Sequence, residues 1–97
     1  MNLETFVNVV SAEVVGPYQI RLTFDDGLER VIDFREVLHG PVFAPLHDQT
    51  IFAQVTVNQD TGTIEWPTGA DFSPVVLHDW PDYVEVLKQQ QRHLAVV

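Results

Sequence analysis

The chain contains no cysteine among its 97 residues. Disulfides, thiolate metal sites and cysteine nucleophiles are therefore excluded. A chain without cysteine suits a reducing compartment, and we predict a cytoplasmic protein. The first residues lack the basic and apolar regions of a signal peptide. No apolar run approaches the length that a membrane span requires, so we expect no membrane association.

Basic residues are also scarce. Five lysines and arginines stand against fourteen acidic residues, which gives a formal charge of −9. Nucleic-acid-binding surfaces need clustered cations, so direct nucleic-acid binding is disfavoured. The acidity has two interpretations. It keeps a small domain soluble, or it complements a basic partner.

The familiar catalytic and ligand-binding motifs are missing as well. Neither serine lies in a G-x-S-x-G nucleophile elbow. The five glycines are dispersed and form no phosphate-binding loop. The histidines have no zinc-ligand spacing, and we expect them on the surface: His39, His47, His78 and His93. The sequence therefore predicts neither a cofactor nor a metal site.

The first half of the chain contains strand patterns. Residues 5–15 are rich in valine, and residues 18–24 alternate between apolar and polar side chains. Asp25-Asp26-Gly27 then forms a strong hairpin signal, because Asp-Gly tolerates the positive φ angles of such turns. In the returning strand, residues 28–34, Arg30 interrupts the apolar face, which suits an edge strand.

Short helices and a second hairpin follow. Asp48 is placed to cap a helical turn over residues 49–53. Residues 55–58 and 63–66 predict two more strands, and so short a connection requires antiparallel pairing. Ser73-Pro74 then predicts a helix start, with Ser73 as the capping residue.

The last helix is predicted over about residues 81–94. Its apolar stripe outlasts the part needed to cover the core, and three of its members form a candidate interaction surface: Tyr83, Leu87 and Leu94. We predict a single domain over residues 1–97, of the α+β class. It consists of a small antiparallel β-sheet of hairpins with short connecting helices and a C-terminal α-helix.

A distinctive corner joins the last strand to these helices. It consists of Trp66, Pro67, Gly69, Ala70 and Asp71, with a threonine between Pro67 and Gly69. Asp71 is a candidate general base or metal ligand, but we favour a structural role in which its carboxylate accepts backbone N–H bonds and holds the turn. Trp66 is a candidate stacking platform, but we favour a core position with its indole N–H bonded locally.

The corner also supports a family resemblance. Leu22-Thr23-Phe24-Asp25-Asp26-Gly27, Gly40-Pro41-Val42-Phe43-Ala44-Pro45-Leu46 and Trp66-Pro67-Thr68-Gly69-Ala70-Asp71 resemble the bacterial family called domain of unknown function 2442, over about residues 7–77. The resemblance implies a small α+β domain, sometimes encoded beside other small domains. Some members resemble components of toxin–antitoxin-like pairs. It implies no activity.

Our leading hypothesis is a non-catalytic protein-interaction module that binds a protein partner or forms a homodimer. Two alternatives remain open. A small hydrolase would use Asp71 with a histidine such as His78. A regulator would associate with DNA through a partner, because the chain itself is too acidic to bind duplex unaided.

Overall fold

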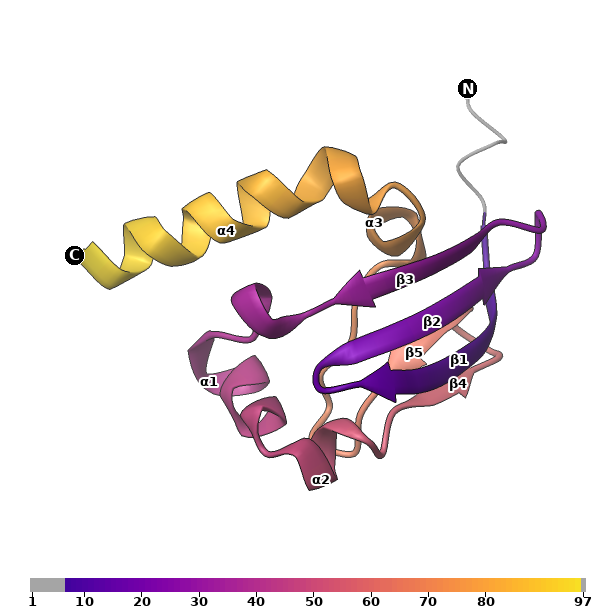
Figure 1. Cartoon of the computed structure of the whole chain (residues 1–97), viewed down its shortest axis with the longest axis horizontal. Coiled ribbons are helices and arrows are strands. Elements are labelled where there is room, and N and C mark those ends of the chain that lie inside the picture. Colours follow the sequence, from indigo (N-terminus) through magenta and orange to yellow (C-terminus); the bar gives the residue numbers. More distant parts are fainter. Residues whose placement is uncertain (1–6, 97) are drawn as a thin grey trace.

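The computed structural model describes residues 7–96, with side chains placed as far as Lys88. The chain forms two small sheets, a group of short helices and one long helix (Figure 1). The strands are β1 (Val9–Gly16), β2 (Gln19–Phe24), β3 (Glu29–Asp33), β4 (Thr56–Asn58) and β5 (Thr63–Glu65). The helices are η2 (Arg35–Val37), α1 (Gly40–Phe43), η3 (Ala44–His47), α2 (Gln49–Phe52), α3 (Pro74–His78) and α4 (Trp80–Val96). This architecture confirms the predicted α+β class.

The first sheet has the antiparallel order β1-β2-β3. As the alternation of residues 18–24 predicts, Ile20, Leu22 and Phe24 are buried on one face of β2. The hairpin between β2 and β3 turns at Gly27, whose φ is 91°. The predicted start of β1 near residue 5 lies outside the described residues, and β1 begins at Val9.

The chain makes two sheets where the sequence pattern had suggested one. Strands β4 and β5 pair with each other as a separate antiparallel hairpin. This hairpin lies behind the first sheet in Figure 1. The Val9 N–H donates to the Gly62 carbonyl over 2.8 Å, so the start of β1 is tied to the β4–β5 turn. The two sheets therefore enclose a common core.

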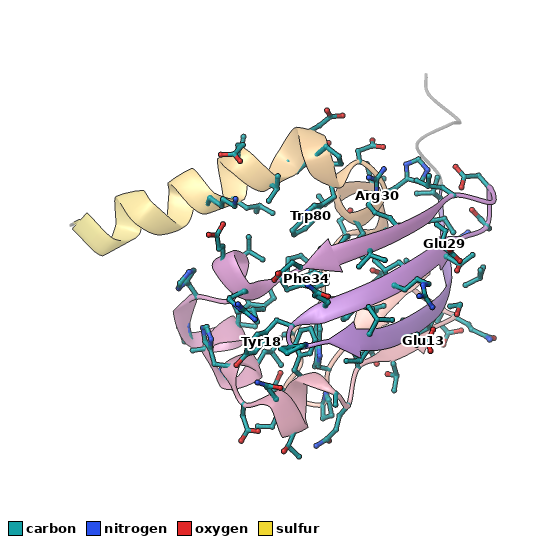
Figure 2. All side chains as sticks on the ribbon, in the orientation of Figure 1. Glu13, Tyr18, Glu29, Arg30, Phe34 and Trp80 are labelled. Carbon is teal, nitrogen blue, oxygen red and sulfur yellow. The ribbon has the colours of Figure 1, made fainter. Side chains whose placement is uncertain are left out.

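Aromatic rings fill that core. Phe34, which directly follows β3, is fully buried, and its ring centroid lies 5.2 Å from that of Phe72 and 5.4 Å from that of Trp80. Trp66 and Phe52 complete the group, with ring centroids 5.7 Å apart. Figure 2 shows Trp80 extending from the start of α4 toward Phe34. The long helix is thus attached to the core at its first residue.

Two helix caps were predicted, and one is confirmed. The Asp48 carboxylate accepts a hydrogen bond from the Thr50 N–H at 2.9 Å, at the start of α2. Ser73 occupies the predicted capping position of α3, but its hydroxyl makes no capping bond. Pro74 at the first helical position lacks an N–H, so the start of α3 has one donor fewer to satisfy.

Helix α4 begins one residue before the predicted start and extends to Val96. Its first turns pack on the core through Trp80, Val84 and Leu87. Its far end extends away from both sheets in Figure 1. Among the described residues, no helix is both long enough and apolar enough to cross a membrane.

Candidate functional site

The Trp66–Asp71 corner is a closed turn whose tryptophan belongs to the core. The Gly69 N–H donates to the Trp66 carbonyl at 2.9 Å, and the Trp66 N–H donates to the Ala70 carbonyl at 3.0 Å. Gly69 has a φ of 92°, a conformation that favours glycine. The indole N–H of Trp66 donates to the buried Phe52 carbonyl at 2.9 Å. The predicted core position of Trp66 is confirmed. Its indole N–H is hydrogen-bonded as expected, but the acceptor lies in α2, 14 residues earlier, and not within the corner itself.

Asp71 has a different role from the one predicted. Its side chain is exposed, and within residues 7–88 its carboxylate accepts no hydrogen bond. The expectation that this carboxylate holds the turn through backbone N–H groups is therefore wrong. Backbone bonds and Gly69 close the turn instead, and Asp71 forms a backbone bridge with Glu65. Pro67 is exposed, its peptide bond is trans, and Ala70 is fully buried.

His78 lies between two carboxylates. Its Nδ1 is 2.7 Å from Asp79 Oδ1, and its Nε2 is 2.7 Å from Asp26 Oδ2. The hydrogen bond to Asp79 and then that to Asp26 raise the pKa of His78, although burial opposes them. The pKa of Asp26 is lowered, first by the Leu28 N–H and then by His78. The imidazole thus joins the β2–β3 turn to the junction of α3 and α4.

Arg30 strengthens the same connection. Its Nε and Nη2 donate to the His78 carbonyl at 3.1 and 2.8 Å. Arg30, which interrupts the apolar face of β3, therefore donates hydrogen bonds to the carbonyl at the end of α3. With both ring nitrogens bonded to carboxylates, His78 has no nitrogen left to accept a substrate proton. The hydrolase hypothesis requires His78 to pair with Asp71, but its two partners are Asp26 and Asp79.

The two other histidines with described side chains, His39 and His47, are not part of a metal centre. His39 and His47 have ring centroids 6.1 Å apart, and His93 lies beyond the placed side chains. Among the described residues, no group of three His, Asp, Glu or Cys side chains is arranged to hold a metal ion.

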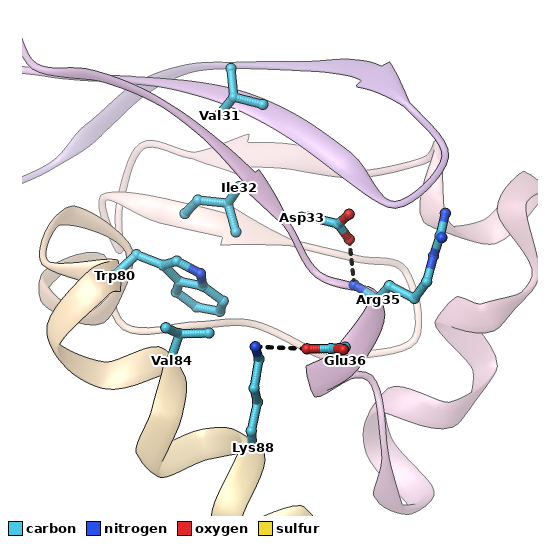
Figure 3. Close-up of a pocket in the computed structure, with 8 residues that line it drawn as sticks. All are labelled: Val31, Ile32, Asp33, Arg35, Glu36, Trp80, Val84 and Lys88. Carbon is cyan, nitrogen blue, oxygen red and sulfur yellow. Dashed lines mark hydrogen bonds and ion pairs between the residues drawn. The ribbon is translucent and has the colours of Figure 1, made fainter.

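A cleft of about 450 Å³ lies between β3, η2 and α4 (Figure 3). Three apolar residues line its inner part, Ile32, Trp80 and Val84. Three charged side chains, Asp33, Arg35 and Glu36, stand on the β3–η2 side, and Val31 and Lys88 complete the lining. The volume is within the range of ligand-binding clefts.

An ion pair closes one end of this cleft. Lys88 Nζ lies 2.7 Å from Glu36 Oε1 and 3.7 Å from Glu85 Oε2. The hydrogen bond to Glu36 is the main cause of the raised pKa of Lys88. The sequence indicates the Glu85–Lys88 pair through its three-residue spacing. It contains no signal for the pairing with Glu36, so the sequence does not predict the cleft.

The three residues of the predicted interaction surface on α4 differ in what the structure shows of them. Tyr83 is 38% exposed, whereas Leu87 is half-buried against the core. Leu94 lies outside the residues whose side chains are described. The structure adds Val86, which is 51% exposed and was not predicted. Tyr83 and Val86 are three residues apart, so they share one side of the helix and form an exposed apolar flank.

The fold and these sites define a small α+β domain with a cleft beside α4 and an exposed apolar flank on that helix. The family model described as protein of unknown function, DUF2442, matches residues 9–81. The chain belongs to this family. Neither the search of curated proteins nor that of solved structures found a match. The matched region ends at Pro81, so it includes the corner, the His78 contacts and only the start of α4.

Proposed function

We propose that this chain is a non-catalytic protein-interaction domain whose partner binds along α4 and the adjoining cleft. The observation that carries the proposal is the exposed apolar flank of α4. Tyr83 and Val86 are 38% and 51% exposed on a helix whose opposite side already packs on the core. Exposed apolar residues that share one side of a helix favour a protein contact, because burying them removes apolar surface from water.

The chemistry of the other sites supports a binding function over hydrolysis. Asp71 is exposed and is not paired with His78, whose ring nitrogens are both bonded to other carboxylates. General acid–base catalysis needs a base within hydrogen-bond reach of its partner. The hydrolase alternative therefore has no geometric support among the described residues.

The partner is a small protein or a second copy of this chain. The family resemblance supports a regulatory or toxin–antitoxin-like pair, since some members resemble components of such pairs. The formal charge of −9 implies that any association with DNA would go through that partner. The absence of cysteine supports a cytoplasmic location.

The test compares two valine substitutions of the same kind. Val86→Asp places a charge on the α4 flank, and Val10→Asp makes the same change at a β1 residue that is 57% exposed. Tagged chains are expressed in the native host, purified, and analysed by mass spectrometry and sedimentation. We expect a stoichiometric partner or a dimer with the unchanged chain and with Val10→Asp, and its loss with Val86→Asp. An unchanged chain that sediments alone as a monomer would refute the proposal.

A further inference from the structure

Strand β3 is an edge strand with hydrogen-bonding groups directed away from its neighbour. The Phe24 N–H donates to the Leu28 carbonyl, and the Phe34 N–H donates to the Tyr18 carbonyl, both at 2.8 Å. Opposing residues of an antiparallel pair alternate between bonded and non-bonded positions. Continuing that alternation along the β2–β3 register assigns the bonded positions of β3 to Arg30 and Ile32.

The other three residues of β3 must then direct their backbone N–H and C=O groups away from β2. They are Glu29, Val31 and Asp33. Within the described part of the chain, none of these backbone groups is hydrogen-bonded to another element. Unpaired groups of this kind form a template for another strand.

The cleft beside β3 can accommodate the side chains of an added strand. Val31 and Asp33 line it at the edge of β3, and Ile32, Trp80 and Val84 form its apolar inner part. Side chains of a strand alternate between two faces. On the core face, an added strand would direct apolar side chains toward Ile32 and the α4 residues. On the outer face, its side chains would lie beside Glu29, Val31 and Asp33, all of which are exposed.

Charge decides which strand fits. If two copies of β3 paired antiparallel over their full length, Val31 would face its own copy and Glu29 would face Asp33 of the other chain. Like charges directly opposite each other destabilise a strand pair. A strand with basic residues at these two positions would instead form two favourable cross-strand pairs.

From this geometry we propose that the edge of β3 binds an extended segment of a basic partner protein by strand addition. The segment carries a basic residue opposite Glu29, an apolar residue opposite Val31 and a basic residue opposite Asp33, with apolar residues between them that enter the cleft. This inference rests on the proposed protein-interaction function and specifies the chemistry of the partner. Strand addition obtains affinity from main-chain hydrogen bonds and specificity from alternate side chains.

The opposite edge of the sheet is less suitable, although β1 also has exposed valines. Its register with β2 shifts between Val9 and Ser11 and again between Val14 and Gly16. Bulges of this kind interrupt the regular row of backbone groups that an added strand needs. Strand β3 pairs with β2 without such a shift.

The probe is a fluorescent seven-residue peptide, Thr-Lys-Leu-Val-Leu-Lys-Thr, whose pattern is the same in either strand direction. One control peptide replaces both lysines by glutamate, and another carries an N-methyl group on the central valine. Binding to the full chain is followed by fluorescence anisotropy at low salt. We expect the lysine peptide to bind about tenfold tighter than either control, because each control removes the charge pairs or one main-chain bond.

Two proline variants test the edge itself. Val31→Pro removes an N–H that points away from β2, so the ladder to β2 stays intact. Val14→Pro makes the same change at the β1 edge, where the register likewise directs the N–H outward. We expect Val31→Pro to weaken peptide binding about tenfold and Val14→Pro to leave it within about twofold. Circular dichroism checks that both variants fold, and the N-methylated peptide repeats the test without changing the protein.

A pair of charge reversals tests the acidic positions. Glu29→Lys should weaken binding of the lysine peptide about fivefold and reduce its salt dependence, whereas Asp60→Lys in the β4–β5 turn should do neither. Equal binding of all three peptides would refute the proposal. A wild-type dimer that Val31→Pro converts to a monomer would refute it too, since the occupant would then be a second copy.

The proposed function and strand addition are distinguished by different results. Val31→Pro is included in the purification from the native host beside Val86→Asp. A partner that is retained by Val31→Pro but lost by Val86→Asp would overturn strand addition and leave the interaction function standing. If the unchanged chain has neither a partner nor a dimer, the proposed interaction function is overturned, whether or not the peptides bind.

Discussion

Replacing Trp66 by phenylalanine tests whether the distinctive corner is structural. The substitution keeps an aromatic ring in the core but removes the indole N–H that donates to the buried Phe52 carbonyl at 2.9 Å. Trp80→Phe is the matched control. Trp80 is also buried, at 8% exposure, but within the described residues its indole N–H has no hydrogen-bond acceptor. The two variants therefore differ chiefly in that hydrogen bond.

The expected cost for Trp66→Phe has two parts. A buried carbonyl left without its donor costs about 1–3 kcal/mol. The smaller ring leaves space beside Phe34 and Phe52, whose centroids lie 6.1 and 5.7 Å from that of Trp66. That space costs about 1 kcal/mol more, a fraction of the loss for a full truncation to alanine. We expect the free energy of unfolding to fall by about 2–4 kcal/mol.

Urea unfolding followed by far-ultraviolet circular dichroism measures both variants, because that signal comes mainly from the backbone amides. Trp80→Phe should cost only about 1 kcal/mol, the part due to volume. For a domain of this size, 3 kcal/mol corresponds to a fall in melting temperature of roughly 12–24 °C. Equal losses in the two variants would show that the bond to Phe52 does not stabilise the corner, and a loss below about 1 kcal/mol for Trp66→Phe would contradict its core role.

Three further predictions concern stability. Because the pKa of His78 is raised, its contribution to the free energy of unfolding is fully present below the ordinary histidine pKa of about 6.5 and is lost as pH rises through the folded-state pKa. His78→Gln should therefore flatten the loss of stability between the ordinary pKa and higher pH, measured by urea unfolding across about pH 5–9. Gly62→Ala should cost about 2 kcal/mol or more and Gly27→Ala only about 1 kcal/mol, although both have positive φ, because only at Gly62 would a Cβ meet the Asn8 side chain; equal thermal shifts would contradict this. Asp71→Asn should change the free energy of unfolding by less than about 0.5 kcal/mol, since its carboxylate is exposed and unbonded within residues 7–88; a large loss would restore the rejected idea that it holds the turn.

Local patterns in the sequence predict most of the strands. The alternation in residues 18–24 correctly identifies Ile20, Leu22 and Phe24 as core residues because a half-buried strand has a period of two. Asp48 is recognisable because a cap acts within its own helical turn. The division into two sheets is not predictable in this way, since it depends on which strand edges meet after the chain has turned.

The candidate site depends on contacts between distant residues. Asp26 and His78 are 52 positions apart, and Glu36 and Lys88 come from different elements, so no periodicity relates the partners. Arg30 is a further example of a contact that the sequence does not predict. Its position on an apolar face is visible in the sequence, but the carbonyl that it satisfies belongs to His78 at the end of α3. Sequence patterns indicate an anomaly there without indicating its partner.

The length of α4 makes a small change in its direction large at its far end. The helix begins at Trp80, two residues after the imidazole that is bonded to Asp26, and it continues for 17 residues. At 1.5 Å per residue its length is about 25 Å, so a tilt of about 10° at its base would move the far end by about 4 Å. The core contacts of Trp80, Val84 and Leu87 hold the first half of α4 against such a tilt. The ion pair between Lys88 and Glu36 adds a further restraint, so the direction of the far half depends on these four side chains.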